Sequence, residues 1–343
     1  MMCMTRCRGF ATLIASTLIY APGHHMTLRS LIKRSVPLSC AYYALDDWLA
    51  GRRLAGGNLR TTSGARHVAL DLDHSLGYID KVYGDYLRYA GLNHFSGDVA
   101  EIGPGDNFGV ALCALAGGAG AVHAIDRWRP DRDDAAQGEI YRALATRPGF
   151  ADLFNDAPSE RSIRHLQYHA GVPAETFFRQ SGHTFDAIIS RAVLEHLYDP
   201  LGALGDMAAA LKPGGLLIHR IDLRDHGMFA DHHPLTFLTI GGGLWRRMTH
   251  NAGRPNRVLL PAYANWIDKA GLEGELLITR LAGVTDEISP ARWKATDAAL
   301  RATALATVEQ IRPRLAPPFR DMTDADLAAQ GCVLVARKPA HQD

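Results

Sequence analysis

Residues 99–109 constrain the fold of this chain more than any other segment. They read VAEIGPGDNFG: a short apolar run ends at Glu101, glycines follow at 103, 105 and 109, and a small-residue helix pattern begins at once. Glycines let the backbone turn sharply and let a ligand approach it closely. The free N–H groups at a helix start favour an electron-rich or anionic ligand group. The segment therefore predicts a buried strand, a tight turn and a helix, with a nucleotide-type cofactor site at the turn.

The spacing of the glycines separates two kinds of cofactor. The dinucleotide fingerprint is G-x-G-x-x-G, whereas the third glycine falls one residue later here and Glu101 precedes the first glycine by two residues. A carboxylate repels a phosphate and attracts a cation. S-adenosylmethionine carries a sulfonium and an α-ammonium, together with a carboxylate for the N–H groups. We therefore expect S-adenosylmethionine as the cofactor; a glycine turn without a ligand is the alternative.

Further apolar runs follow in the same rhythm. Residues 121–126 end in Asp126, which could accept hydrogen bonds from both hydroxyls of a ribose or could cap the next loop. Residues 185–190 form a third run, and the Leu-Lys-Pro-Gly-Gly segment at 211–215 predicts a turn before a fourth run at 216–222. Strands that alternate with helices in this way predict a parallel sheet with helices on both faces.

These segments together resemble the class I S-adenosylmethionine-dependent methyltransferases, above all the bacterial type 11 group with its Val-Leu-Glu-His stretch, here at 193–196. The Glu101-x-Gly-x-Gly pattern is similar to the first motif of that family, and Asp126 is similar to its ribose-binding acid. The resemblance is specific over residues 97–223. It implies an α/β fold, a Rossmann-like three-layer sandwich with a seven-stranded, mostly parallel sheet whose last strand is antiparallel.

The same resemblance implies where the cofactor binds. Ser190 is expected to line the pocket near the methyl group. Residues 167–172 end the third strand without an acid, so the contact with the adenine stays open. The predicted cofactor-binding residues are Glu101, Gly103, Gly105, Asn107, Asp126, Arg127, Ser190 and Arg191.

Histidines and acids that follow two neighbouring strands are the candidate catalytic groups. Methyl transfer mainly requires that two reactants be aligned, and a base is needed only for a poor nucleophile such as a sugar hydroxyl. We predict that His196 or His226 accepts a proton, with Glu195 as an orienting carboxylate; a role in shaping the pocket is the alternative. We expect no metal, because His219 and Asp222 would point to opposite faces of a strand.

The predicted function is that of an S-adenosylmethionine-dependent methyltransferase that O-methylates a small-molecule or glycan acceptor. C-methylation of a lipid- or quinone-like acceptor, and a non-catalytic regulatory protein that binds the cofactor, are the alternatives. The net charge of +1 gives no reason to expect nucleic acid as a partner. The five cysteines are scattered and odd in number, which indicates reduced thiols in the cytoplasm, with contact at a membrane surface as a further possibility, and the type 11 resemblance implies a bacterial protein.

The organisation along the chain is predicted as follows. Residues 1–25 are an over-extended start or a disordered leader. Residues 26–96 form a helical region that covers the cofactor as a lid, and residues 97–339 form the methyltransferase domain, with a substrate cap at 225–271 and an insertion without a readable role at 128–165. Nine basic and only two acidic residues lie within 1–66, so this region could contact a membrane surface or an anionic substrate, or could be a solvated face.

Overall fold

A seven-stranded sheet forms the centre of the protein in the computed structural model, which describes residues 33–57, 60–61, 66–130 and 132–340. The strand order is β5-β3-β2-β6-β7-β9-β8. The last strand is antiparallel to both of its neighbours, and the other four pairs are parallel, which confirms the predicted sheet. The strands are β2 (Gly97–Ile102), β3 (Ala119–Asp126), β5 (Leu166–Ala170), β6 (Phe185–Arg191), β7 (Leu211–Asp222), β8 (Glu273–Leu281) and β9 (Ala329–Arg337).

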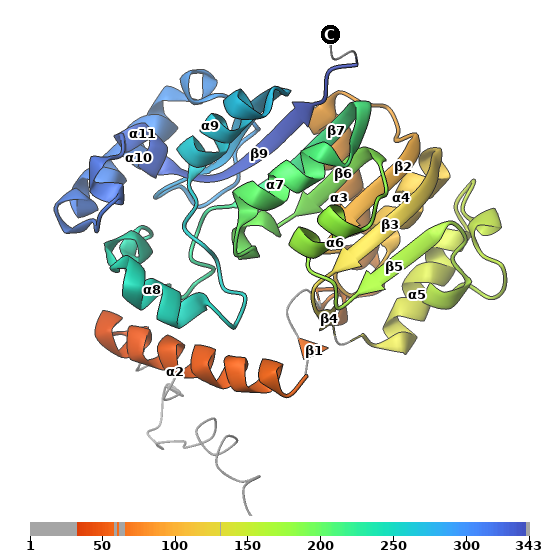
Figure 1. The fold of residues 1–343 in the computed structure, drawn as a ribbon, viewed down its shortest axis with the longest axis horizontal. Helices are drawn as coiled ribbons and strands as arrows, with labels where there is room; N and C mark the ends of the chain where they lie inside the picture. The colour runs from red at the N-terminus through yellow and green to blue at the C-terminus, as the bar shows by residue number, and fades with distance from the viewer. Residues whose placement is uncertain (1–32, 58–59, 62–65, 131, 341–343) are drawn as a thin grey trace, which may run out of the picture.

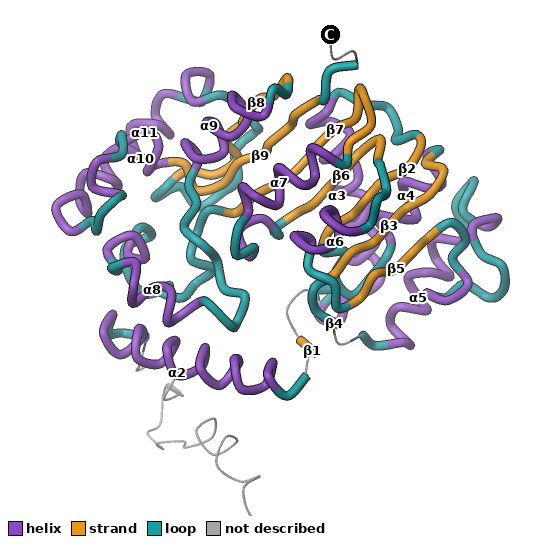
Figure 2. The backbone as a smooth tube through the Cα atoms, in the orientation of Figure 1, coloured by secondary structure: helices purple, strands orange, loops and turns teal. Residues whose placement is uncertain are grey.

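Helices cover both faces of the sheet, so the molecule has three layers (Figures 1 and 2). The helices are α2 (Val36–Ala55), α3 (Leu72–Ala90), α4 (Gly109–Gly117), α5 (Asp134–Ala145), α6 (Ala174–Gln180), α7 (Pro200–Ala209), α8 (Gly242–Thr249), α9 (Leu260–Ala270), α10 (Ala298–Ile311) and α11 (Asp324–Ala328). One core contains α3, α4 and α5, and the other contains α6, α7 and α9. Successive strand residues alternate between the cores, as Ile188 and Ile189 do.

The fourth predicted strand begins earlier than expected. We predicted a turn at 211–215, but β7 starts at Leu211, which pairs with Phe185 before the register shifts. The physical reason is that Gly214, with φ 79°, absorbs the irregularity inside the strand, so the ladder continues across the Pro-Gly-Gly segment instead of ending there.

The helix α2 lies beside α8, a helix of the predicted substrate cap (Figure 1). Asp47 on α2 accepts hydrogen bonds from the backbone N–H groups of Asn251 (2.9 Å) and Ala252 (2.8 Å). A short parallel pair, β1 (Arg60–Thr61) with β4 (Arg129–Pro130), joins the N-terminal region to the segment after β3. The N-terminal region is therefore tied to two loops that follow strands of the main sheet.

The predicted leader lies outside the described residues, as does most of the basic N-terminal segment. Among the helices that the structure describes, none combines the length and the apolar character that a bilayer crossing requires. The boundaries assigned to the lid, the domain and the cap stay predictions.

Candidate active site

A cavity of about 920 Å³ lies at the carboxyl ends of β2, β3 and β6. This is the edge at which parallel α/β sheets bind ligands. Its walls come from segments that are far apart in the sequence: α2, the glycine turn after β2, the end of β3, the segment after β6, the loop after β7 and residues 251–254. The predicted cofactor loop and the predicted catalytic histidines therefore share one cavity.

The glycine turn forms one wall, and at Gly103 it leaves no room for a side chain. Gly103 and Gly105 have φ values of 71° and 75°, in the left-handed region that favours glycine. A Cβ atom placed on Gly103 would lie 2.5 Å from Cγ2 of Val193. Asp106 joins the turn to the N-terminal region, because its carboxylate accepts hydrogen bonds from the backbone N–H groups of His67 (3.0 Å) and Val68 (3.1 Å).

Two carboxyl groups next to this turn fit a cationic, ribose-bearing ligand. Glu101 is only 5% exposed, and its Oε2 has no hydrogen-bond partner among the described residues. Burial, assisted by the negative charge of Asp126, raises the pKa of Glu101 to about 8. Burial also raises the pKa of Asp126 to about 6, although the hydrogen bond from the backbone N–H of Trp128 acts in the opposite direction. A cation near the turn would offset the cost of these buried charges, and the residues present therefore fit S-adenosylmethionine.

The predicted cofactor residues occupy different positions around the turn. Gly103, Gly105, Asp126, Arg127 and Arg191 line the cavity. Glu101 belongs to the layer behind the wall and is not itself part of the lining.

Two predicted residues lie elsewhere than expected. Ser190 is fully buried, and its hydroxyl is hydrogen-bonded to Nδ1 of His219 at 2.8 Å, so it does not line the cavity. The reason is the alternation of side chains along β6, which turns Ser190 inward and leaves the wall to the residues that follow. Asn107 is also absent from the lining: its Oδ1 accepts the N–H of Gly109 and its Nδ2 donates to Gln137, so it holds the start of α4.

The two predicted cofactor-binding arginines of the lining are held by neighbouring residues. Arg127 donates a hydrogen bond to the hydroxyl of Tyr198 (2.8 Å). Arg191 forms an ion pair with Asp85 of α3 (2.9 Å), and both side chains are largely buried. The end of β6 is therefore fixed to a helix of the N-terminal region.

The structure brings the three predicted catalytic residues together. The rings of His196 and His226 have centroids 4.8 Å apart, and both residues line the cavity. Nε2 of His226 lies 3.7 Å from Oε1 of Glu195 and 3.7 Å from Oδ2 of Asp222. His226 has a φ of 51° and Ala192, also on the wall, has 56°, which for residues with a side chain is strained backbone of the kind that clusters at functional sites.

The two histidines differ in their electrostatic surroundings. Nδ1 of His196 lies 2.8 Å from the carbonyl oxygen of Gly253, which only accepts, so Nδ1 carries the proton and Nε2 is left as the acceptor. Burial lowers the pKa of His196 to about 4. Burial also lowers the pKa of His226, but the charge of Asp222 opposes this shift. Burial raises the pKa of Glu195 to about 8. Of the two, His226 is the histidine with carboxyl groups placed to stabilise a proton.

One set of side chains has the spacing of metal ligands. Glu195, His196 and His226 each offer one ligand atom, and these atoms lie within 4.8 Å of one another. His219, which the sequence placed in a different candidate set, is fully buried and bonded to Ser190. The expectation that no metal binds stays a prediction.

Sequence reasoning missed Arg132, which lies in the insertion whose role was unreadable. Its guanidinium donates to the carbonyl oxygen of Gly105 (3.1 Å) and lies over the rings of Phe108 (4.3 Å) and Tyr168 (4.6 Å). It also forms an ion pair with Glu160 (2.5 Å). Arg132 therefore anchors residues 128–165 to the cofactor turn. The charged run directly after the second strand was the available signal.

Comparisons with known proteins identify the family. Residues 79–277 match the family model described as "Methyltransferase domain", which covers more than half of the chain, so the chain belongs to this family. The family depends on S-adenosylmethionine, and the predictions of an S-adenosylmethionine-dependent methyltransferase, of this cofactor and of an enzyme are confirmed. The alternative of a non-catalytic regulatory protein is set aside.

A curated relative is similar over a short stretch. The ubiquinone biosynthesis O-methyltransferase of Parvibaculum lavamentivorans is 49% identical over 95 residues, which are 25% of this chain and 37% of that protein. The match spans little more than a third of the length of this relative.

Solved structures resemble the chain more loosely. The N-methyltransferase NodS of Bradyrhizobium japonicum, bound to S-adenosylhomocysteine, is 15% identical, with a TM-score of 0.39 over 81% of this chain and 97% of that chain. The phosphoethanolamine N-methyltransferase 2 of Haemonchus contortus is 14% identical, with a TM-score of 0.39 over 78% and 56%.

Proposed function

We propose that this protein transfers a methyl group from S-adenosylmethionine to a hydroxyl oxygen of a small molecule, with His226 as the proton acceptor. The observation that carries the proposal is the position of His226: it lines the cavity of the glycine turn, and its Nε2 lies 3.7 Å from Oδ2 of the Asp222 carboxylate and 3.7 Å from Oε1 of the Glu195 carboxyl group. A hydroxyl is a poor nucleophile, and a histidine beside a carboxylate is a suitable general base for it.

The described residues divide the work of such a reaction between them. The bound donor supplies a methyl group on a positively charged sulfur. Gly103 and Gly105 would let the backbone approach the donor, and the carboxylate of Asp126 would accept hydrogen bonds from its ribose. Ala50 and Leu54 of α2 add apolar surface to the wall of the cavity. His226 accepts the hydroxyl proton, and the negative charge of Asp222 next to it stabilises the resulting imidazolium.

Two further observations support oxygen as the acceptor atom. The curated relative with a matching stretch is named as an O-methyltransferase. The alternative of C-methylation relied on Phe237 as an apolar wall for a lipid-like acceptor, but Phe237 is fully buried in the core and does not line the cavity. A glycan acceptor has no separate support, and we keep a small molecule with a free hydroxyl as the proposed acceptor.

The test is methyl transfer from methyl-labelled donor to a panel of phenols, catechols and sugars, with the labelled position read by NMR. The proposal expects label on oxygen. His226→Gln should lower kcat by about 10²–10⁴-fold, the usual contribution of a general base, and should leave the Kd for S-adenosylhomocysteine unchanged. His74→Gln, on the exposed surface of α3, is the matched control. Label on carbon or nitrogen, or full activity of His226→Gln, would contradict the proposal.

A further inference from the structure

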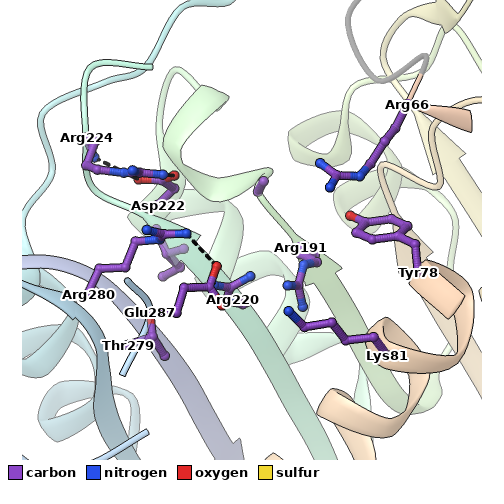
Figure 3. A pocket seen from close by; sticks show the side chains of 12 residues that line it. Arg66, Tyr78, Lys81, Arg191, Arg220, Asp222, Arg224, Thr279, Arg280 and Glu287 are labelled. Atoms are coloured by element: carbon purple, nitrogen blue, oxygen red, sulfur yellow. Dashed lines mark hydrogen bonds and ion pairs between the residues drawn. The ribbon is translucent and has the colours of Figure 1, made fainter. Parts of the chain in front are cut away.

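A second cavity, of about 400 Å³, is unusually rich in positive charge (Figure 3). It lies at the carboxyl ends of β6, β7 and β8, and only two carboxylates, Asp222 and Glu287, line it. Six cationic side chains line what we call the basic pocket: Arg66, Lys81, Arg191, Arg220, Arg224 and Arg280.

Ion pairs neutralise only part of this charge. Glu287 is shared by Arg220 (2.5 Å) and Arg280 (2.6 Å). Burial alone would raise the pKa of Glu287, but these two guanidinium groups outweigh it and lower the pKa to about 2. One carboxylate therefore serves two cations and stays ionised.

Arg191 and Arg224 are also paired, with Asp85 (2.9 Å) and Asp222 (2.6 Å), whereas Lys81 and Arg66 have no ion-pair partner among the described residues. In the part of the chain that the structure describes, no carboxylate pairs with Lys81, and Arg66 lies over the ring of Tyr78 (4.2 Å) without an ion pair. The side chains of Arg220 and Arg191 are only 13% and 12% exposed. The six cations of the pocket meet three carboxylates, Glu287, Asp222 and Asp85, so positive charge is in excess, and an anion between the cations would balance it.

The basic pocket adjoins the methyl-transfer cavity. Tyr78, Arg191 and Ala192 line both spaces. Asp222, on the wall of the basic pocket, lies 3.7 Å from Nε2 of His226. In Figure 3 the arginines of β7 and β8 face Lys81 and Arg66 across the pocket, with Arg191 between them. A molecule with its hydroxyl at His226 could therefore extend past Ala192 into the basic pocket.

We propose that the basic pocket binds an acidic group, a carboxylate or phosphate, of the methyl acceptor and so positions the hydroxyl at His226. The inference rests on the proposed function for the reaction that it assists, but the pocket and its charge are independent of that reaction. Planar guanidinium groups suit oxyanions because they donate two parallel hydrogen bonds. The acceptor class is then a hydroxylated small molecule that is itself an anion.

The binding test uses inorganic phosphate and benzoate, with benzamide as the neutral isostere of benzoate, titrated calorimetrically into the full chain. We expect phosphate and benzoate to bind, benzamide not to bind, and affinity to fall with added sodium chloride. Lys81→Gln and Arg280→Gln should each weaken binding by about tenfold, the usual effect of losing one charge-assisted hydrogen bond. Lys81→Arg and Arg280→Lys keep the charge and should retain most of the affinity.

The matched control is Arg292→Gln, because Arg292 is an exposed arginine paired with Glu275 (3.0 Å) outside the basic pocket. It should leave anion binding unchanged. Lys81 is exposed on α3, so Lys81→Gln should fold even if Arg280→Gln does not. Absence of anion binding, or equal weakening by Arg292→Gln, would overturn the assignment.

Two acidic groups could occupy the basic pocket: that of the methyl acceptor, and the carboxylate of the donor. Competition with S-adenosylhomocysteine distinguishes them. If the pocket takes the acceptor, phosphate should bind equally well to the protein saturated with S-adenosylhomocysteine. If it takes the carboxylate of the donor, S-adenosylhomocysteine should displace phosphate, and the proposal is wrong. Methyl transfer to hydroxybenzoate should also have a lower KM than transfer to hydroxybenzamide, and Lys81→Gln should remove that difference.

The two proposals can fail separately. Anion binding that depends on Lys81 and Arg280, combined with label on carbon or nitrogen, would refute O-methylation and leave the basic pocket assigned. Label on oxygen with no preference for the acidic acceptor would refute the pocket assignment alone.

Discussion

A Cβ atom on Gly103 would lie 2.5 Å from Cγ2 of Val193, a distance that real Cβ contacts essentially never show. The turn after β2 and the segment after β6 are therefore packed so closely that only glycine fits between them. Gly103 also has a φ of 71°. Both the available space and the backbone conformation forbid a side chain at the centre of the cofactor turn.

Gly103→Ala should displace the turn and weaken the binding of S-adenosylhomocysteine by more than about tenfold, because overpacking of this kind costs about 1–3 kcal/mol. Calorimetry measures the affinity, and thermal unfolding checks that the variant folds. The matched control is Gly84→Ala in α3, where an added Cβ meets nothing within 4 Å and the helix gains from alanine. Unchanged affinity in Gly103→Ala would show that the turn does not bind the cofactor.

The contribution of Glu101 to the stability of the ligand-free protein should fall as the pH rises from about 6.5 to 8. The folded-state pKa of Glu101 is raised by burial to about 8, so the folded protein holds a proton that the unfolded chain has already released. Stability from such a group is complete below the unfolded pKa and is lost as the pH rises toward the folded pKa. One group contributes a slope of about 1.4 kcal/mol per pH unit in this window.

Urea unfolding at pH 6.5, 7.25 and 8 measures this slope. Glu101→Gln should remove the part of the slope that one carboxyl group contributes. Glu195, whose pKa is also about 8, contributes a second part of the same sign. Glu139→Gln, at an exposed position of α5 within the insertion, is the control and should leave the slope unchanged. A slope that is identical in Glu101→Gln and the unaltered protein would contradict the assigned burial of this carboxyl group.

Metal removal distinguishes two uses of the cluster formed by Glu195, His196 and His226. If His226 acts as the base, dialysis against EDTA should leave methyl transfer unchanged, and added Mg²⁺ or Zn²⁺ should not raise it. Activity that disappears with EDTA and returns with one of these ions would instead assign the three side chains as metal ligands. Elemental analysis of the purified protein provides the second readout.

The sequence was sufficient to predict the sheet and the cofactor edge because both depend on local patterns. Apolar runs that end in an acid place Glu101 and Asp126 at the ends of adjacent parallel strands, and this geometry follows from the strand order alone. The pairing of His196 with His226 was predicted only in outline. The pairing depends on the left-handed backbone conformation of His226, and no local sequence pattern predicts that conformation.

Side-chain direction and tertiary packing were beyond the sequence patterns. Whether Ser190 or the next residue faces the cavity depends on where the regular alternation of β6 ends. A shift of one residue turns each side chain to the opposite face of the sheet. The anchoring role of Arg132 depends on how residues 128–165 fold back over the turn. The basic pocket gathers cationic side chains from the ends of three strands, the loop after β7 and two N-terminal segments, so no short motif could indicate it.

A crystal structure of the full chain with S-adenosylhomocysteine tests the central claim most directly. We predict the ligand along Gly103 and Gly105, its ribose hydroxyls within hydrogen-bond distance of the Asp126 carboxylate, and its sulfur facing the side of the cavity that holds His226. A ligand bound elsewhere, or a sulfur that faces away from His226, would contradict the account.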